Sequence, residues 1–250
     1  MLLHHDISGH GPAVVLLHSG VADSGMWLGT REVLADSFTV ITPDLRGYGQ
    51  TPLPGERYSD AADVLVLLEH LGVQRFSLVG SSYGGHVALQ VASAAADRVE
   101  RLVLLCSAAD GVVHTDDLRE FAREEDALLE AGDVEAATAL NVRTWLGPDA
   151  DGATRARVHA MQAHAFTVQL AADEGLDSFE LDVDLSSITA PATVVCGTHD
   201  LEFFRLVAQH LSEQLPDARL VELDWAGHLP ALERPTDTVQ LIRDALHTPG

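Results

Sequence analysis

One serine in this chain lies in a turn of small residues that suits a nucleophile. The stretch Gly80-Ser81-Ser82-Tyr83-Gly84 follows an apolar run (76–79) and precedes a segment with helical spacing (83–95). A G-x-S-x-G turn between a strand and a helix holds its central serine in a strained, exposed conformation that requires small neighbours. At a helix start, the hydroxyl also faces backbone N–H groups that stabilise developing negative charge. The pattern predicts that Ser82 is a nucleophile, the alternative being a Gly-Ser turn without chemistry.

A serine nucleophile needs a general base, and the base needs an acid that orients it. For this type of turn the partners follow in the order serine, acid, histidine, each after a late strand. Asp200 comes shortly after the apolar run 192–196, and His228 shortly after the run 219–223. Both would lie at the same sheet edge as Ser82. We therefore predict a catalytic triad of Ser82, His228 and Asp200.

Other titratable residues compete for these roles, since the chain has 13 histidines. His199 adjoins the predicted acid and His86 lies in the helix after the serine; we interpret both as structural. Asp110 is a second candidate for the acid. The pair His4-His5 has no companion acids at ligand spacing, so we predict no metal site. No G-x-G-x-x-G follows the first strand, so we expect no dinucleotide and no other cofactor.

A second donor to a developing oxyanion is expected from the loop His18-Ser19-Gly20, which follows the apolar run 13–17. A loop at this position can aim one backbone N–H at the point faced by the Tyr83 N–H. The donor is Gly20 or Val21, and we favour Gly20. We interpret His18 as a brace for the loop.

The elements that must position these residues alternate along the chain, as in a parallel sheet covered by helices. Six runs are apolar on both faces and predict strands, and four segments between or after them have helical spacing. The alternation breaks between Cys106 and residue 192, where three further helices are predicted. The predicted strands are 13–17, 38–42, 76–79, 99–105, 192–196 and 219–223; the helices are 58–71, 83–95, 203–215 and 235–247, with 115–131, 134–145 and 153–172 in the insertion.

Composition narrows the possible partners. The 250 residues include 38 acidic and 15 basic side chains, giving a formal net charge of −23. Nucleic acid and anionic membranes are therefore disfavoured as partners. All the basic residues are arginine, which excludes a Schiff-base or P-loop lysine and is typical of a GC-rich bacterial genome.

The remaining composition suggests a soluble protein. The two cysteines, Cys106 and Cys196, end apolar runs and are interpreted as packing residues. The first residues lack the basic start and apolar stretch of a secretory signal, and no run is long enough to span a bilayer. We expect a cytoplasmic protein.

Together these motifs resemble the α/β-hydrolase superfamily over essentially the whole chain. Besides the serine turn, the acid and the histidine, the family's D-x-R-G-x-G loop corresponds to Asp44-Leu45-Arg46-Gly47-Tyr48-Gly49. Ser19 departs from the family, which usually has glycine there. The resemblance implies a mostly parallel, doubly wound sheet with a helical cap inserted after the sixth strand. The core would be 1–108 and 190–250, and the cap 109–189.

Within the superfamily the chain is similar to 3-oxoadipate enol-lactonases and related small esterases. The shared features are His18-Ser19, Asp23 and Met26-Trp27, and the cap turn Trp145-Leu146-Gly147-Pro148. This implies a serine hydrolase that cleaves a small carboxylic ester or lactone through an acyl-enzyme. The cap and core would supply the substrate pocket, for which the candidates are Trp27, Trp145, Met161, Phe166 and Leu229.

Several functions stay open at this point. The same triad serves C–C bond (β-diketone) hydrolases and perhydrolases, and some relatives are slow-turnover ligand receptors. Haloalkane dehalogenases and epoxide hydrolases of this fold need a carboxylate nucleophile, so Ser82 argues against them. An anionic lactone would need a local cation, for which Arg143 is the candidate. We expect a small-molecule substrate and a monomer or homodimer.

Overall fold

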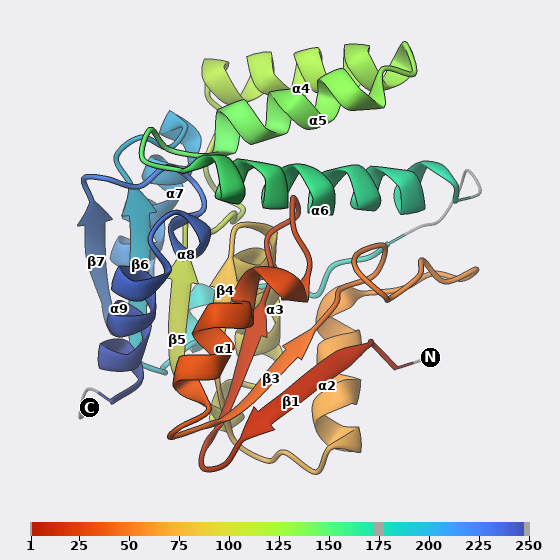
Figure 1. Ribbon diagram of the computed structural model, residues 1–250. Helices are drawn as coiled ribbons and strands as arrows, with labels where there is room; N and C mark the ends of the chain where they lie inside the picture. The colour runs from red at the N-terminus through yellow and green to blue at the C-terminus, as the bar shows by residue number, and fades with distance from the viewer. Residues whose placement is uncertain (1, 173–177, 248–250) are drawn as a thin grey trace.

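The computed structural model describes residues 2–172 and 178–247. Its centre is a seven-stranded sheet in the order β1-β3-β2-β4-β5-β6-β7, parallel except for β1 (Figure 1). The strands are β1 (His5–Gly9), β2 (Ala13–Leu17), β3 (Thr39–Pro43), β4 (Phe76–Ser81), β5 (Val99–Leu105), β6 (Ala192–Gly197) and β7 (Ala218–Leu223). All six predicted strands are present, with ends that shift by one or two residues.

Helices cover both faces of the sheet. On one face α1 packs against α9, and on the other α3 packs against α2 and the central strands, with α7 over β6 and β7 (Figure 1). The central strands are buried on both sides, as their continuous apolar sequences predict. The helices are α1 (Leu28–Leu34), α2 (Asp60–His70), α3 (Tyr83–Ala94), α7 (Glu202–Gln214), α8 (Pro230–Glu233) and α9 (Pro235–His247), with short 3-10 turns at Ser24–Trp27, Ala96–Arg98 and Leu185–Ser187.

Three helices form a cap above the carboxyl ends of the strands (Figure 1). They are α4 (Asp116–Glu130), α5 (Val134–Trp145) and α6 (Gly152–Leu170), and they match the helices predicted for the insertion. Asp133 and Asp151 cap α5 and α6 by accepting backbone N–H groups of the first turn. A left-handed glycine, Gly132, ends α4 and allows the sharp reversal into α5.

The α/β-hydrolase fold expected from the motifs is confirmed, but the strand count differs. The insertion follows β5, the fifth strand in chain order, rather than a sixth. Only one strand, β1, precedes β2, and it pairs antiparallel with β3. The sequence did not predict β1 because it is an edge strand with a largely exposed, mixed sequence, HDISG. At the other edge, β7 is also half-exposed rather than apolar on both faces as predicted.

The return from the cap lies along the core. The backbone N–H of Leu181 donates to Gln90 on α3, and that of Asp184 donates to Ser93 on the same helix. Residues 181–184 were assigned to the cap from the sequence, and the boundaries of that assignment stay a prediction. In residues 2–172 and 178–247, no helix has both the length and the apolar character needed to cross a membrane.

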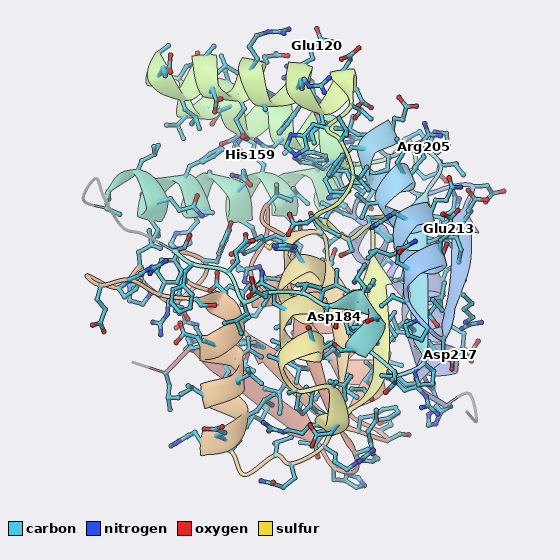
Figure 2. All side chains as sticks on the ribbon, turned by 180° about the vertical axis from the view of Figure 1, so that it is seen from behind. Glu120, His159, Asp184, Arg205, Glu213 and Asp217 are labelled. Carbon is cyan, nitrogen blue, oxygen red and sulfur yellow. The ribbon has the colours of Figure 1, made fainter. Side chains whose placement is uncertain are left out.

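Acidic side chains cover much of the exterior. Figure 2 shows three exposed acidic side chains from different parts of the fold: Glu120 on α4, Glu213 on α7, and Asp184 just before the 3-10 turn Leu185–Ser187. Exposed acidic side chains thus occur on cap and core alike. At long range this surface repels anions.

Both cysteines are free and buried, in agreement with the interpretation that they are packing residues. Burial raises the pKa of Cys196 to about 11 and raises that of Cys106 well above its ordinary value. At pH 8 a thiol of pKa about 11 is ionised in only about one molecule in a thousand, and the thiolate is the reactive form.

We therefore expect that neither cysteine of the native protein reacts with Ellman's reagent at pH 8, and that both react in guanidinium chloride. Rapid labelling of either thiol in the native protein would contradict this burial.

Candidate active site

The turn between β4 and α3 has the strained geometry that its sequence predicts. Ser82 has φ 53° and ψ −117°, a conformation that residues with side chains rarely adopt. The glycines two positions before and after Ser82 have no room for a side chain. A Cβ on Gly80 would lie 2.4 Å from the Gly84 carbonyl oxygen, and a Cβ on Gly84 would lie 2.4 Å from the Leu17 carbonyl oxygen. The glycines thus let α3 approach β2 and β4 closely enough to hold the turn.

The three residues of the predicted triad are connected by hydrogen bonds. Ser82 Oγ lies 2.7 Å from His228 Nε2, and His228 Nδ1 lies 2.7 Å from Asp200 Oδ2. Asp200 follows β6 and His228 follows β7, so the carboxyl ends of three strands supply the three groups. Because a carboxylate only accepts, His228 donates its Nδ1–H to Asp200 and accepts the Ser82 hydroxyl at Nε2. This arrangement allows the imidazole to remove the serine proton.

A buried carboxylate, Glu233, holds the loop that carries the histidine. Its Oε2 accepts the backbone N–H of Gly227 (2.9 Å) and of Gly147 in the cap (3.1 Å), and its Oε1 accepts that of Leu229 (3.0 Å). Gly227 and Leu229 flank His228, so the carboxylate fixes the backbone on both sides of the imidazole. Burial raises the pKa of Glu233, while the three N–H groups oppose the shift. Sequence reasoning missed Glu233, although Gly227 and Leu229 lie only six and four residues before it, because no motif marks the backbone turn that brings their N–H groups to its carboxylate.

We expect Glu233→Gln to destabilise the protein by about 1–3 kcal/mol, because the amide NH₂ would face backbone donors and leave at least one of them unpaired. The displaced loop should also lower kcat. Urea unfolding and steady-state kinetics measure the two effects. Glu222→Gln on the exposed face of β7 is the matched control. Equal stability of the two variants would show that Glu233 does not anchor the loop.

Two aromatic side chains enclose the imidazole. The ring of Phe204 on α7 lies 4.1 Å from that of His228, and the ring of Trp145 at the end of α5 lies 4.7 Å from it, centroid to centroid. The Trp145 carbonyl also accepts the His228 backbone N–H at 2.9 Å. The cap therefore contacts His228 directly, and only 2% of that residue is exposed.

The loop after β2 lies beside the serine turn, as predicted for an oxyanion loop. Gly20 and Val21 line the same cavity as Ser82, and a Cβ on Gly20 would lie 3.5 Å from the Tyr83 Cβ. In residues 2–172 and 178–247, the backbone N–H groups of Gly20, Val21 and Tyr83 have no backbone acceptor. They remain available to a ligand oxygen, and the choice between Gly20 and Val21 stays a prediction in favour of Gly20.

His18 is a brace for this loop. It is fully buried, its Nδ1–H donates to the Ser19 carbonyl (2.9 Å), and its Nε2 accepts the Leu45 N–H (2.9 Å). Burial lowers the pKa of His18, so the ring stays neutral and keeps both hydrogen bonds at neutral pH. It joins the loop after β2 to the loop after β3.

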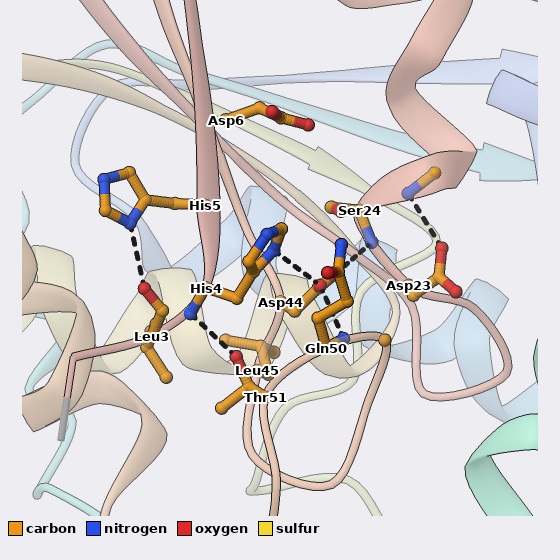
Figure 3. A network of polar contacts seen from close by, with 12 residues as sticks. Leu3, His4, His5, Asp6, Asp23, Ser24, Asp44, Leu45, Gln50 and Thr51 are labelled. Atoms are coloured by element: carbon orange, nitrogen blue, oxygen red, sulfur yellow. Dashed lines mark hydrogen bonds and ion pairs between the residues drawn. The ribbon is translucent and has the colours of Figure 1, made fainter.

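Asp44 makes a second connection between these loops (Figure 3). One carboxylate oxygen accepts the Ser24 N–H (2.9 Å); the other accepts the Gln50 N–H (2.9 Å) and lies 3.2 Å from His4 Nδ1. His4 thus has one acidic partner, 40 residues away in sequence. The aspartate of the D-x-R-G-x-G motif is therefore a structural anchor for the oxyanion loop.

A cavity of about 270 Å³ lies between the triad and the cap. Of the predicted pocket residues, Trp145 and Phe166 line it. Trp27 and Leu229 do not, because both are completely buried in the core. Met161 does not either, because it packs in the core cluster, with its sulfur near Gly25. The lining consists of Ser19, Gly20, Val21, Tyr48, Ser82, Phe121, Glu125, Asn141, Trp145, Gln162, Phe166, Gln169 and His228.

The residues considered as alternatives lie elsewhere. His86 on α3 contacts Glu180 (Nε2 to Oε1, 3.2 Å), and Asp110 lies close to both, with ligand atoms of the three within 4.8 Å of one another. This half-exposed group is separate from the triad, so Asp110 does not orient His228. His199 is exposed. Arg143 is exposed and pairs with Glu124, so it does not line the cavity.

Comparisons with known proteins identify the family to which this fold belongs. The family model described as "alpha/beta hydrolase fold" matches residues 12–235. The chain belongs to this family. It is 29% identical to the putative carbamate hydrolase RutD of Agrobacterium fabrum over 248 residues, covering 93% of this chain and 94% of that protein.

Two further relatives are an esterase and a lactonase by name. The pimeloyl-[acyl-carrier protein] methyl ester esterase of Nitrosomonas europaea is 29% identical, covering 98% of this chain and 99% of that protein. The crystal structure of the enol-lactonase from Burkholderia xenovorans LB400 superimposes with a TM-score of 0.81 at 26% identity, covering 98% of this chain and 96% of that one. The resemblance to enol-lactonases and small esterases is therefore confirmed, and the protein is a hydrolase-family member of the esterase and lactonase type.

Proposed function

We propose that this protein is a serine hydrolase that cleaves a small carboxylic ester or lactone through an acyl-enzyme on Ser82. The observation that carries the proposal is the unbroken hydrogen-bond chain from Ser82 through His228 to Asp200, with Ser82 and His228 lining a cavity of about 270 Å³. A serine activated in this way attacks carbonyl carbon. The names of the relatives, an esterase, an enol-lactonase and a putative carbamate hydrolase, support attack on such a carbonyl.

In the proposed mechanism, Ser82 Oγ attacks the carbonyl carbon while His228 Nε2 takes its proton. Asp200 keeps the imidazole oriented and stabilises the imidazolium. The N–H groups of Gly20 and Tyr83 bind the oxyanion. Removing one such donor typically destabilises the transition state by about 3–4 kcal/mol. The imidazolium then protonates the leaving alkoxide, and His228 activates water to release the acid.

The size of the cavity supports a small substrate. Its volume of about 270 Å³ is below the range of about 300–1,000 Å³ typical of sites for drug-sized ligands. At about 30 Å³ per water molecule in the liquid, it has the volume of roughly nine waters. Four aromatic rings in the lining provide apolar contact for an acyl chain or ring: Tyr48, Phe121, Trp145 and Phe166.

We expect Ser82→Ala to lower kcat for ester hydrolysis by about 10⁴–10⁶-fold, because removal of a triad serine leaves only binding and the oxyanion donors. Hydrolysis of p-nitrophenyl acetate and of γ-butyrolactone measures this. A fluorophosphonate probe, detected by mass spectrometry, should label residue 82 of the wild type only. Ser81→Ala is the control, since the buried Ser81 hydroxyl has no partner in the described part of the chain. Near-full activity of Ser82→Ala would rule out the mechanism.

A further inference from the structure

Each of the three cap helices contributes polar as well as aromatic residues to the wall of the cavity that faces the triad. Glu125 comes from α4, Asn141 from α5 and Gln162 from α6. The Asn141 side-chain nitrogen donates to the Glu125 carboxylate and to the Ala137 carbonyl (3.0 Å). Its oxygen accepts the Trp145 indole N–H at 2.7 Å. Both Asn141 donors are therefore occupied within the cap, and Glu125 keeps its second carboxylate oxygen for another donor.

Gln162 presents an acceptor without a partner. The residue is only 3% exposed, and its side-chain oxygen makes no hydrogen bond within residues 2–172 and 178–247. Ser19, on the core side of the cavity, has a buried hydroxyl that is likewise unpaired there. Buried polar atoms almost always have a hydrogen-bond partner. An unpaired acceptor in the wall of a substrate cavity therefore suggests that the ligand supplies the donor.

The charge of the cavity wall disfavours an anionic substrate. No arginine or lysine is among the described residues that line the cavity, whereas one carboxylate, Glu125, is. Arg143, which could have offset the charge of an anionic substrate, pairs with Glu124 on the exposed surface. Burial raises the pKa of Glu125, while the hydrogen bond from Asn141 opposes this rise. A substrate carboxylate would meet this group without a compensating cation.

We propose that the cavity selects an ester or lactone whose acyl part carries a hydrogen-bond donor, an O–H or N–H, and rejects one that carries a carboxylate. Gln162 accepts the donor, and Glu125 repels the carboxylate. This inference rests on the proposed hydrolase function and names its substrate class. A preference of this kind would distinguish this protein from enzymes whose lactone substrates are anionic. The fold and the triad geometry by themselves would suit neutral and anionic substrates equally.

Pairs of methyl esters that differ in one group test the proposal, with proton release as the assay. Methyl 3-hydroxypropanoate and methyl butanoate exchange O–H for CH₃ at nearly equal size. Methyl N-acetylglycinate and methyl 4-oxopentanoate exchange N–H for CH₂ and each contain a single ester, so the two pairs distinguish a hydroxyl from an amide donor. Monomethyl succinate presents the carboxylate. In the wild type we expect kcat/KM to favour at least one donor ester over its partner by about tenfold.

Two variants assign the preference to residues. Gln162→Met has similar volume but no acceptor, so the ratio of kcat/KM within the preferred pair should fall to about one. Glu125→Gln retains an oxygen for Asn141 but loses the charge, so kcat/KM for monomethyl succinate should rise about tenfold relative to methyl butanoate. The matched controls are Gln209→Met at an exposed position of α7 and Glu120→Gln on the outer face of α4, where Figure 2 shows the side chain exposed.

The outcomes separate this inference from the proposed function. A cooperative urea unfolding transition for Gln162→Met like that of the wild type shows that the variant is folded, and loss of the donor preference then supports the proposal. A wild type that hydrolyses both members of each pair equally, or a preference that persists in Gln162→Met, overturns it while the hydrolase function stands. A protein that hydrolyses none of the esters and no lactone overturns the proposed function itself.

Discussion

The 2.7 Å contact between Ser82 Oγ and His228 Nε2 joins two residues 146 positions apart, and much of the molecule serves to hold it. The serine is fixed by a backbone turn so tight that the residues two positions before and after it, Gly80 and Gly84, must be glycine. The imidazole is fixed by Asp200 through its other nitrogen and by Glu233 through the backbone on either side. Because β4, β6 and β7 run in the same direction, their carboxyl ends bring all these loops to one edge of the sheet.

Buried acids act as anchors for loops in this strongly acidic chain. Asp44 accepts two backbone N–H groups, Glu233 accepts three, and Asp60 accepts the Arg46 N–H (2.9 Å) and the Tyr83 hydroxyl (2.7 Å). A carboxylate is costly to bury unless its oxygens are hydrogen-bonded, and these are. Because each acid joins loops from different parts of the chain, it fixes the relative position of groups that surround the serine.

Trp145 connects the cap directly to His228. Trp145 accepts the His228 N–H at its carbonyl, packs its ring on the imidazole, and donates its indole N–H to Asn141 in the cavity wall. The same side chain therefore contacts the base and the polar wall that faces the triad. A shift of α5 would alter both, so the shape of the substrate cavity and the orientation of the histidine depend on each other.

The sequence by itself determined the features that depend on neighbours in the chain. The G-x-S-x-G turn, the order of serine, acid and histidine, six of the strands and the three cap helices all follow from local backbone geometry and from the period of apolar residues. Tertiary structure decided the contacts that depend on how each helix is rotated about its axis and on which distant loops come together. It placed Glu125 and Gln162 in the cavity wall, left Met161 and Trp27 in the core, and joined Glu233 to Gly147 of the cap. Which side of a cap helix faces the serine is set by packing against the sheet, and no local pattern encodes that contact.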